Sequence, residues 1–251
     1  VRIPDTGELF GNGISIKPSV NLQPEVGNNL NLGFIVDRRG LCGLVRVQWE
    51  TNFYYMMMKN MIRLFPADTR SIYTNLGKTR TIGMDTDVKV DVTRNVYLYF
   101  NLTLQDIRDR QRWFNDEQGT SNPTYNKHVP NIPAFYYNYG MEYHAEGLIG
   151  RRELSRVYID VSHVGEFDWG WQMSSLAEER RKWRIPSNDV FTIGLQQSLW
   201  HNNMSLSLEL ENVFNKENYM EFKMPLPGRT LKAKLRFNLF RDKLAGGAMS
   251  L

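Results

Sequence analysis

The chain has 251 residues, of which 41% are hydrophobic and 12% aromatic, and this composition excludes a disordered or low-complexity protein. The formal net charge is +4, without the clustered lysines and arginines of a nucleic-acid-binding surface. The single cysteine, Cys42, excludes a disulfide framework and any cysteine-rich metal site. No apolar run approaches the ~20 residues of a membrane-spanning helix, but a β-barrel alternates apolar with polar residues and escapes that test.

The predicted elements are β-strands, because hydrophobic residues alternate with polar ones along almost the whole chain. In residues 82–92, isoleucine, methionine and valine occupy even positions, while aspartate and lysine occupy odd ones. Residues 96–105 and 204–211 show the same period of two, and helical spacing fits none of these windows. The sequence therefore predicts nine strands, at residues 28–37, 43–58, 71–92, 94–107, 133–146, 152–166, 188–200, 203–214 and 229–240.

The connections between these strands alternate in length. Short ones are expected at residues 37–43, 93–95, 146–152 and 201–202, and long ones at about 59–70, 108–132, 167–187 and 215–228. Long strands with short turns at one end and long loops at the other are typical of an outer-membrane barrel, whereas a soluble sandwich has shorter strands. We therefore predict an all-β, transmembrane antiparallel β-barrel, with apolar faces toward lipid and polar faces toward a wet lumen.

Three motifs follow one another along the chain. The first is Asn21-Leu22-Gln23-Pro24-Glu25 with residues 29–34, the second is residues 74–78 with Gly83-Met84-Asp85, and the third is residues 211–219 with Pro227-Gly228-Arg229-Thr230. In their order and spacing across about residues 18–240, they resemble the C-terminal half of TonB-dependent outer-membrane receptors. Within the third motif, Asn212 can end a strand by bonding its own backbone, and Pro227 and Gly228 suit a sharp entry into the strand that begins near Arg229.

The resemblance implies a barrel of about 22 strands that encloses a plug, with energy supplied by TonB. Nine strands here leave thirteen, and the plug, for a second polypeptide. We expect residues 1–27 to be an extracellular loop segment, residues 28–240 the C-terminal barrel strands and residues 241–251 a C-terminal tail, with the plug domain and TonB box absent. Because the chain begins at Val1, we expect a receptor cleaved, or encoded in two pieces, at a surface loop.

The function implied by the resemblance is import of a bulky nutrient across the bacterial outer membrane: a ferric siderophore, haem, cobalamin, or an oligosaccharide or peptide. The alternative is a structural or secretion-associated outer-membrane barrel without active transport. We expect no enzyme, because no catalytic motif is present and the four histidines are scattered. No cofactor is expected. The expected partners are the TonB complex and outer-membrane lipid or lipopolysaccharide, without nucleic acid.

Two long loops combine arginine with tryptophan, a pairing that suits anionic or aromatic cargo through charge and stacking. The candidate ligand contacts are Arg112, Trp113, Trp169, Trp171, Arg181 and Trp183. The alternative for these loops is a solvated surface whose basic residues face lipopolysaccharide. Asn212, Pro227, Gly228 and Arg229 are expected to be structural, as parts of the third motif.

Overall fold

The computed structural model of the chain describes residues 1–65, 70–113, 121–171, 177–221 and 223–237. All nine predicted strands are present there in the predicted order, and the all-β prediction is confirmed. They are β2 (Val26–Arg39), β3 (Arg46–Phe65), β4 (Ser71–Asp91), β5 (Val96–Asp109), β6 (Phe135–Glu146), β7 (Leu154–Val164), β10 (Asn188–Leu199), β11 (Met204–Glu211) and β14 (Thr230–Phe237). The predicted tail at residues 241–251 lies outside the described residues.

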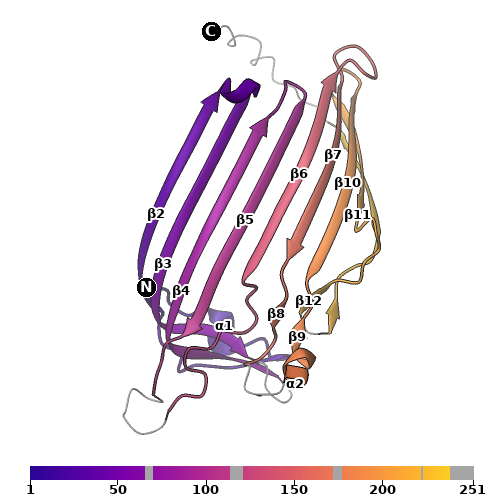
Figure 1. Cartoon of the computed structure of the whole chain (residues 1–251). Helices are drawn as coiled ribbons and strands as arrows, with labels where there is room; N and C mark the ends of the chain where they lie inside the picture. Colours follow the sequence, from indigo (N-terminus) through magenta and orange to yellow (C-terminus); the bar gives the residue numbers. More distant parts are fainter. Residues whose placement is uncertain (66–69, 114–120, 172–176, 222, 238–251) are drawn as a thin grey trace.

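These strands form one curved antiparallel sheet in which each long strand pairs with its neighbour in sequence (Figure 1). The order across the sheet is β2-β3-β4-β5-β6-β7-β10-β11-β14. Within the described residues, β2 pairs only with β3, and β14 pairs only with β11. The sheet is therefore a section of barrel wall with two open edges.

Short elements flank this wall. They are α1 (Thr6–Phe10), β1 (Ile16–Lys17), the 3₁₀ turn η1 (Leu41–Gly43), β8 (Phe167–Asp168), α2 (Ala177–Lys182), β9 (Arg184–Ile185), β12 (Tyr219–Glu221) and β13 (Met224–Pro225). The strand β1 pairs in parallel with the start of β4, so the segment before β2 crosses the β3–β4 hairpin. No helix in the described part of the chain is long and apolar enough to cross a membrane.

The connections segregate by length, as predicted. Short ones lie at one end of the wall, called the turn end, and comprise residues 40–45, 92–95, 147–153 and 200–203. The opposite end, called the loop end, has residues 110–134, 165–187 and 212–229, together with α1 and α2 (Figure 1).

The predicted long loop at residues 59–70 is wrong in part. Residues 59–65 continue β3, which has 20 residues and pairs with the 21 residues of β4. Two features hide this extension in the sequence. Residues 56–58 are all methionine, which interrupts the alternation, and Asn60 has a φ of 58°, which departs from regular strand geometry.

One face of the wall is apolar across every strand. The register aligns Trp49 with Val88 and Val88 with Phe100, and farther along it aligns Leu195 with Leu208. On β4 this face runs from Ile82 to Val90, eight residue steps or about 27 Å, which at a strand tilt of ~40° spans roughly 20 Å. With the flanking aromatic residues, this height suits the ~25 Å apolar band of an outer-membrane barrel.

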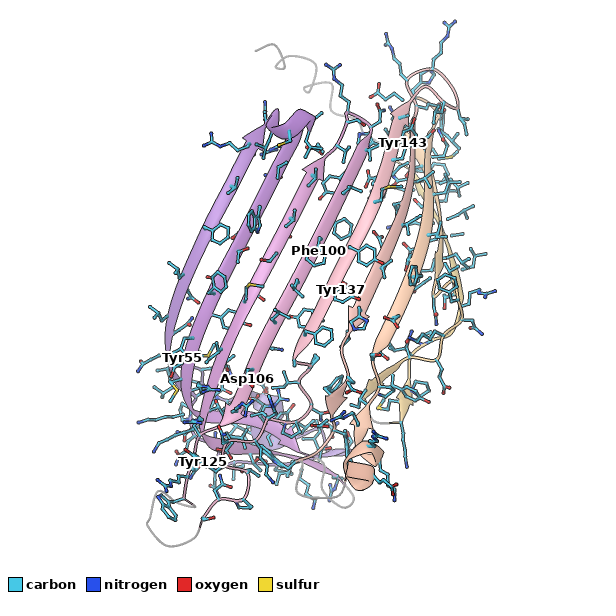
Figure 2. All side chains as sticks on the ribbon, viewed as in Figure 1. Tyr55, Phe100, Asp106, Tyr125, Tyr137 and Tyr143 are labelled. Carbon is cyan, nitrogen blue, oxygen red and sulfur yellow. The ribbon has the colours of Figure 1, made fainter. Side chains whose placement is uncertain are left out.

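Aromatic side chains on this face mark both ends of the band. Tyr55 lies toward the loop end and Tyr143 toward the turn end, with Phe100 between them (Figure 2). Each is exposed by 36–42%, which is consistent with contact to lipid rather than to a protein core. The strand register therefore assembles one continuous apolar face from the residues that the sequence predicts to point outward.

The opposite face is polar and carries hydrogen bonds that span three strands. On β5, the Tyr99 hydroxyl donates to the Asp160 carboxylate of β7 at 2.7 Å, passing over Gly140 of β6. On β7, the Tyr158 hydroxyl donates to Glu209 of β11 at 2.6 Å. The intervening residue on β10 is Gly194, where a Cβ atom would lie 2.0 Å from the Tyr158 ring. Glycine is required at these positions because the tyrosine rings occupy the space of a side chain.

We expect Gly194→Ala to lower the free energy of unfolding by about 1–3 kcal/mol, because the added methyl group displaces the Tyr158 ring and its bond to Glu209. Denaturant titration of the folded barrel measures the change. Gly170→Ala is the control, since a Cβ atom there meets nothing within 4 Å. In a Tyr158→Ala background the cost of Gly194→Ala should disappear, and an unchanged cost would refute the steric explanation.

Candidate functional site

The loop end collects the candidate ligand contacts. The strands β8 and β9 pair through Phe167–Ile185 and Asp168–Arg184, and this short hairpin brings together two tryptophans separated by 14 positions. The Trp169 and Trp183 rings stack with centroids 5.4 Å apart and an angle of 14° between their planes. Trp183 is 49% exposed, so the stack presents an aromatic surface to the outside of the loop.

A salt bridge supports this hairpin from its other side. The Arg184 guanidinium donates to Glu166 at 2.7 Å and to Asp168 at 3.3 Å. The Asn131 backbone N–H donates to the Asp168 carbonyl at 2.7 Å, which ties the loop before β6 to the hairpin. These contacts hold the tryptophan stack at a fixed place on the loop end.

The remaining candidates lie in the same two long loops. Arg181 is exposed on α2, and Trp171 is half-buried just beyond β8. In the other long loop, the Arg112 guanidinium carbon lies 5.4 Å from the Trp113 ring centroid, a cation–π pair. Trp113 also forms an isolated bridge with Ser121. The structure therefore shows two pairs among the six candidates, Trp169 with Trp183 and Arg112 with Trp113.

Beside these loops, on the polar face, is a cavity of about 370 Å³, called here the carboxamide cavity, which the sequence does not predict. Its lining is dominated by carboxamide side chains, which both donate and accept hydrogen bonds. These are Asn21, Gln23, Asn60, Asn75, Gln111 and Asn122, with Asp109 and Thr124. The amides come from separate segments without regular spacing, so the sequence offers no pattern that would reveal the cavity.

Asp109 organises one wall of this cavity. The residue is 3% exposed, and its carboxylate accepts hydrogen bonds from the Gln111 backbone at 2.8 Å, from Asn122 at 2.9 Å and from Thr124 at 2.5 Å. Because a buried carboxylate is stable only when its oxygens are hydrogen-bonded, these three donors explain its position. They also fasten the loop before β6 to the end of β5.

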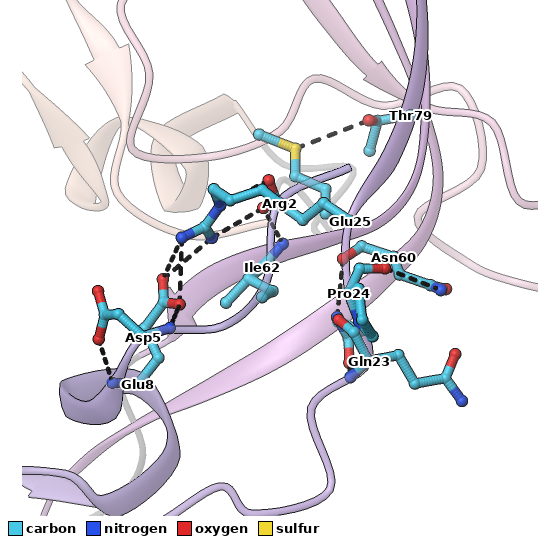
Figure 3. Close-up of polar contacts among 11 residues, drawn as sticks. Arg2, Asp5, Glu8, Gln23, Pro24, Glu25, Asn60, Ile62 and Thr79 are labelled. Atoms are coloured by element: carbon cyan, nitrogen blue, oxygen red, sulfur yellow. Dashed lines mark hydrogen bonds and ion pairs between the residues drawn. The ribbon is translucent and has the colours of Figure 1, made fainter.

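The opposite wall is the segment before β2, which two clusters of polar contacts hold against β3 and β4 (Figure 3). The Asn75 side chain accepts from the Gln23 backbone N–H at 2.8 Å and donates to the Gln23 carbonyl at 3.0 Å. The Arg2 guanidinium donates to Glu8 at 3.0 Å and to Glu25 at 2.8 Å. The Glu25 carboxylate also accepts from the Ile62 backbone at 2.7 Å.

These contacts change the acidity of the groups involved. Burial acts to raise the pKa of Glu25, but the hydrogen bonds from Arg2 and Ile62 outweigh it and hold that pKa below its usual value. Hydrogen bonds from Arg2 to Glu25 and Glu8 raise the pKa of the Arg2 guanidinium. Arg2 and Glu25 therefore stay ionised across neutral pH. The bond from Arg2 to Glu8 ties α1 to this cluster, and a capping box between Asp5 and Glu8 begins the helix.

The third sequence motif connects β11 to β14 at the loop end. Asn212, with a φ of 51°, donates to the Lys216 carbonyl at 2.8 Å and to the Pro227 carbonyl at 3.4 Å. The Asn215 side chain accepts from the Arg229 backbone at 2.9 Å, next to Gly228. Asn218, 1% exposed, accepts from the Asp189 backbone N–H and donates to the Asp189 carbonyl. These contacts join the segment between β11 and β14 to itself and to the start of β10.

A second cavity, of about 310 Å³, lies on the polar face of the wall, farther from the loop end than the carboxamide cavity. Its acidic residues are Glu50, Asp85 and Asp87, and Asp87 pairs with Lys89 at 2.9 Å. Thr103 donates to Asp85 at 2.7 Å, and Asn101 bonds to Asp87. Among the described residues, no group of three or more histidine, cysteine, aspartate or glutamate side chains is arranged to hold a metal ion.

Comparison with known proteins identifies this architecture. A family model described as TonB dependent receptor-like, beta-barrel matches residues 1–213. Among curated proteins, none matches the chain. Solved structures that resemble it include the copper transporter OprC, with a TM-score of 0.64, 19% identity, and coverage of 94% of this chain and 35% of that one.

Two iron-uptake proteins show the same fold. The ferric yersiniabactin uptake receptor FyuA from Yersinia pestis has a TM-score of 0.56 and 14% identity, covering 84% of this chain and 28% of that one. The FrpB iron transporter from Neisseria meningitidis has a TM-score of 0.58 and 15% identity, covering 88% and 32%. The chain thus spans about a third of the length of these structures.

Proposed function

The chain belongs to the β-barrel family of TonB-dependent receptors, which lies in the bacterial outer membrane and comprises transporters rather than enzymes, and from this premise we propose that it forms the C-terminal part of the wall of an importer for a bulky nutrient. The observation that carries the proposal is the two-faced curved sheet, apolar outside and polar inside, with the tryptophan stack and the carboxamide cavity at its loop end.

The open edges at β2 and β14 require further strands to complete the pore. An unpaired strand edge does not persist in lipid, because its backbone groups would lack hydrogen-bond partners. We propose that about thirteen further strands and a plug lie outside residues 1–251, on a second polypeptide or on the same one, and pair with both edges. In this proposal the loop end, including residues 1–25, is extracellular, and TonB acts through the plug.

The loop end supports binding of a large ligand from outside. The Trp169–Trp183 stack offers an aromatic surface, and the carboxamide cavity offers uncharged donors and acceptors next to the lumen. These two features suit ferric siderophores, haem, cobalamin, and oligosaccharides or peptides, because each of these ligands has surface that can stack on an aromatic ring and groups that can form hydrogen bonds. We propose that Trp169, Trp171, Trp183, Arg112, Trp113 and Arg181 contact this ligand during capture.

Uptake by cells that carry the assembled receptor tests the proposal. We expect one labelled member of a panel of ferric siderophores, haem, cobalamin and oligosaccharides to accumulate only when TonB is present. Replacing both Trp169 and Trp183 with alanine should weaken binding of that ligand about tenfold, through loss of the stack. The matched control is Trp200→Ala, an exposed tryptophan at the turn end, which should bind normally.

Two results would contradict the proposal. If no panel member accumulates, or if accumulation is equal without TonB, the barrel is not an energised importer of these ligands. If Trp200→Ala weakens binding as much as loss of the stack does, the loop end is not where the ligand is captured.

A further inference from the structure

Three methionine side chains line one cavity on the polar face of the wall, toward the loop end. Met56 and Met58 alternate with Met57 along β3, so they point to the polar face while Met57 points to the apolar face. The alternation ends at Asn60, where the backbone is left-handed with a φ of 58°, and Met61 beyond it lines the same cavity as the first two. Met56, Met58 and Met61 are called here the thioether cluster.

The cavity beside the thioether cluster has a volume of about 380 Å³ and is bounded by β2, β3, β4 and β5. The other residues of its lining, most of them polar, are Asn29, Asn31, Tyr54, Thr81, Asp85, Gln105 and Ile107. All three methionines are half-buried, so they border open space instead of filling a core. A wet lumen alone favours polar side chains on this face, and the three thioethers therefore need another explanation.

The register brings the three sulfur atoms within reach of one another. The Thr79 hydroxyl donates to the Met61 sulfur at 3.6 Å (Figure 3), and Thr79 is directly opposite Met58. The Met61 sulfur is therefore held at the cross-strand neighbour of Met58. Met56 is opposite Thr81, one step along the same face, about 7 Å from Met58. Because methionine has three rotatable side-chain bonds, the sulfurs can converge on one point of the cavity.

The chemistry of these groups selects one kind of ligand. Thioether sulfur is neutral and polarizable, and among metal ions it favours soft ones such as Cu(I). Hard divalent ions need several oxygen ligands instead. Among the described residues that line the cavity, Asp85 supplies the only carboxylate, and it already accepts from the Thr103 hydroxyl at 2.7 Å. Three neutral sulfurs beside one negative charge match a monovalent soft ion.

We propose that the thioether cluster binds a soft monovalent metal ion, Cu(I) or Ag(I). Each of the three methionines supplies one sulfur ligand, and Asp85 supplies the compensating charge at the edge of the cavity. The inference rests on the proposed function in one respect, since that function makes the polar face the wall of a lumen open to water and ions. Methionine is then present on this face for its sulfur, whereas Met57 on the other face serves as an apolar side chain.

Titration of the assembled receptor with silver(I), in detergent and chloride-free buffer, tests this inference. The parent protein carries Cys42→Ser, because an exposed thiol also binds soft metals. The triple variant Met56→Leu, Met58→Leu, Met61→Leu should bind silver about a hundredfold more weakly, since even residues that only orient metal ligands contribute roughly ten- to a hundredfold. The matched control, Met57→Leu, should bind as the parent does. Leucine conserves the side-chain volume, so these variants differ from the parent chiefly in sulfur.

Two further arms identify the ligands. Cu(I) bound to the parent, kept reduced with ascorbate, should show sulfur neighbours in its X-ray absorption spectrum, and this arm decides the question even if the triple variant fails to assemble. Excess zinc or magnesium should leave silver bound, because thioethers disfavour these harder ions. Equal silver binding by the triple variant, a parent that binds no silver, copper without sulfur neighbours, or displacement by zinc would each overturn the inference.

Nutrient uptake measured with the same receptors separates this inference from the proposed function. TonB-dependent uptake by a receptor that binds no silver refutes the metal site alone. Silver binding that depends on the thioether cluster, without uptake of any nutrient, refutes the importer and leaves the metal site standing.

Discussion

Replacing Leu208 with arginine is expected to destabilise the assembled barrel by about 2–4 kcal/mol in a bilayer. Leu208 lies in the middle of β11 on the apolar face, opposite Leu195 on β10 and Ala233 on β14. It is 39% exposed in the structure, and the proposed environment for that exposed surface is hydrocarbon. A guanidinium there must either lose its hydration or draw water into the membrane, and both cost free energy.

The neighbouring residue is a matched control. Ser207 is on the polar face, opposite Gln196 and Lys234, so an arginine at this position would enter a wet lumen. We expect Ser207→Arg to cost less than about 1 kcal/mol, chiefly from repulsion by Lys234. Unfolding titrations in bilayers compare the two variants. A small cost at Leu208 with a large cost at Ser207 would mean that the two faces are exchanged.

The second large effect concerns orientation. A cysteine at position 170 should react fully with a membrane-impermeant maleimide in intact cells, because Gly170 follows β8 at the loop end and has open space around its Cα. The native Cys42 is exposed at the turn end, between β2 and β3. It should remain unlabelled until the outer membrane is permeabilised.

The comparison is internally controlled, since both thiols are in one chain. Gly170→Cys in a Cys42→Ser background isolates the loop-end signal, and wild type isolates the turn-end signal. Labelling of Cys42 in intact cells, with position 170 protected, would place the long loops in the periplasm and remove the basis for ligand capture from outside.

The strands could be predicted from the sequence because the two faces of each strand contact different solvents. Lipid on one side and water on the other impose a period of two over the full membrane thickness, so windows such as residues 82–92 and 204–211 show it clearly. Beyond the membrane that constraint ends. Residues 59–65 continue β3 there, but the segment before β2 covers part of the hairpin and buries Ile62, so the polar face no longer needs polar side chains.

The candidate site was predictable only in part. Tryptophans in long loops are few and chemically distinctive, and the sequence places Trp169 and Trp183 among the candidates that the structure stacks together. It cannot show which of the tryptophans stack on one another, because the β8–β9 pairing that brings Trp169 and Trp183 together has only two residue pairs. The carboxamide cavity leaves no pattern, since asparagine and glutamine are ordinary residues of turns and polar faces.

The tyrosines that cross glycines on the polar face also have a mechanical consequence. Tyr99 ties β5 to β7, and Tyr158 ties β7 to β11. Each tyrosine therefore links two strands that are separated by one intervening strand of the sheet. Tyr54 crosses Gly83 in the same way, but its hydroxyl has no hydrogen-bond partner among the described residues. The wall from β5 to β11 should therefore resist lateral stretching more than the wall from β2 to β4. In the proposed importer, we expect the compliance of this section of the wall under load to be concentrated beside its first strands.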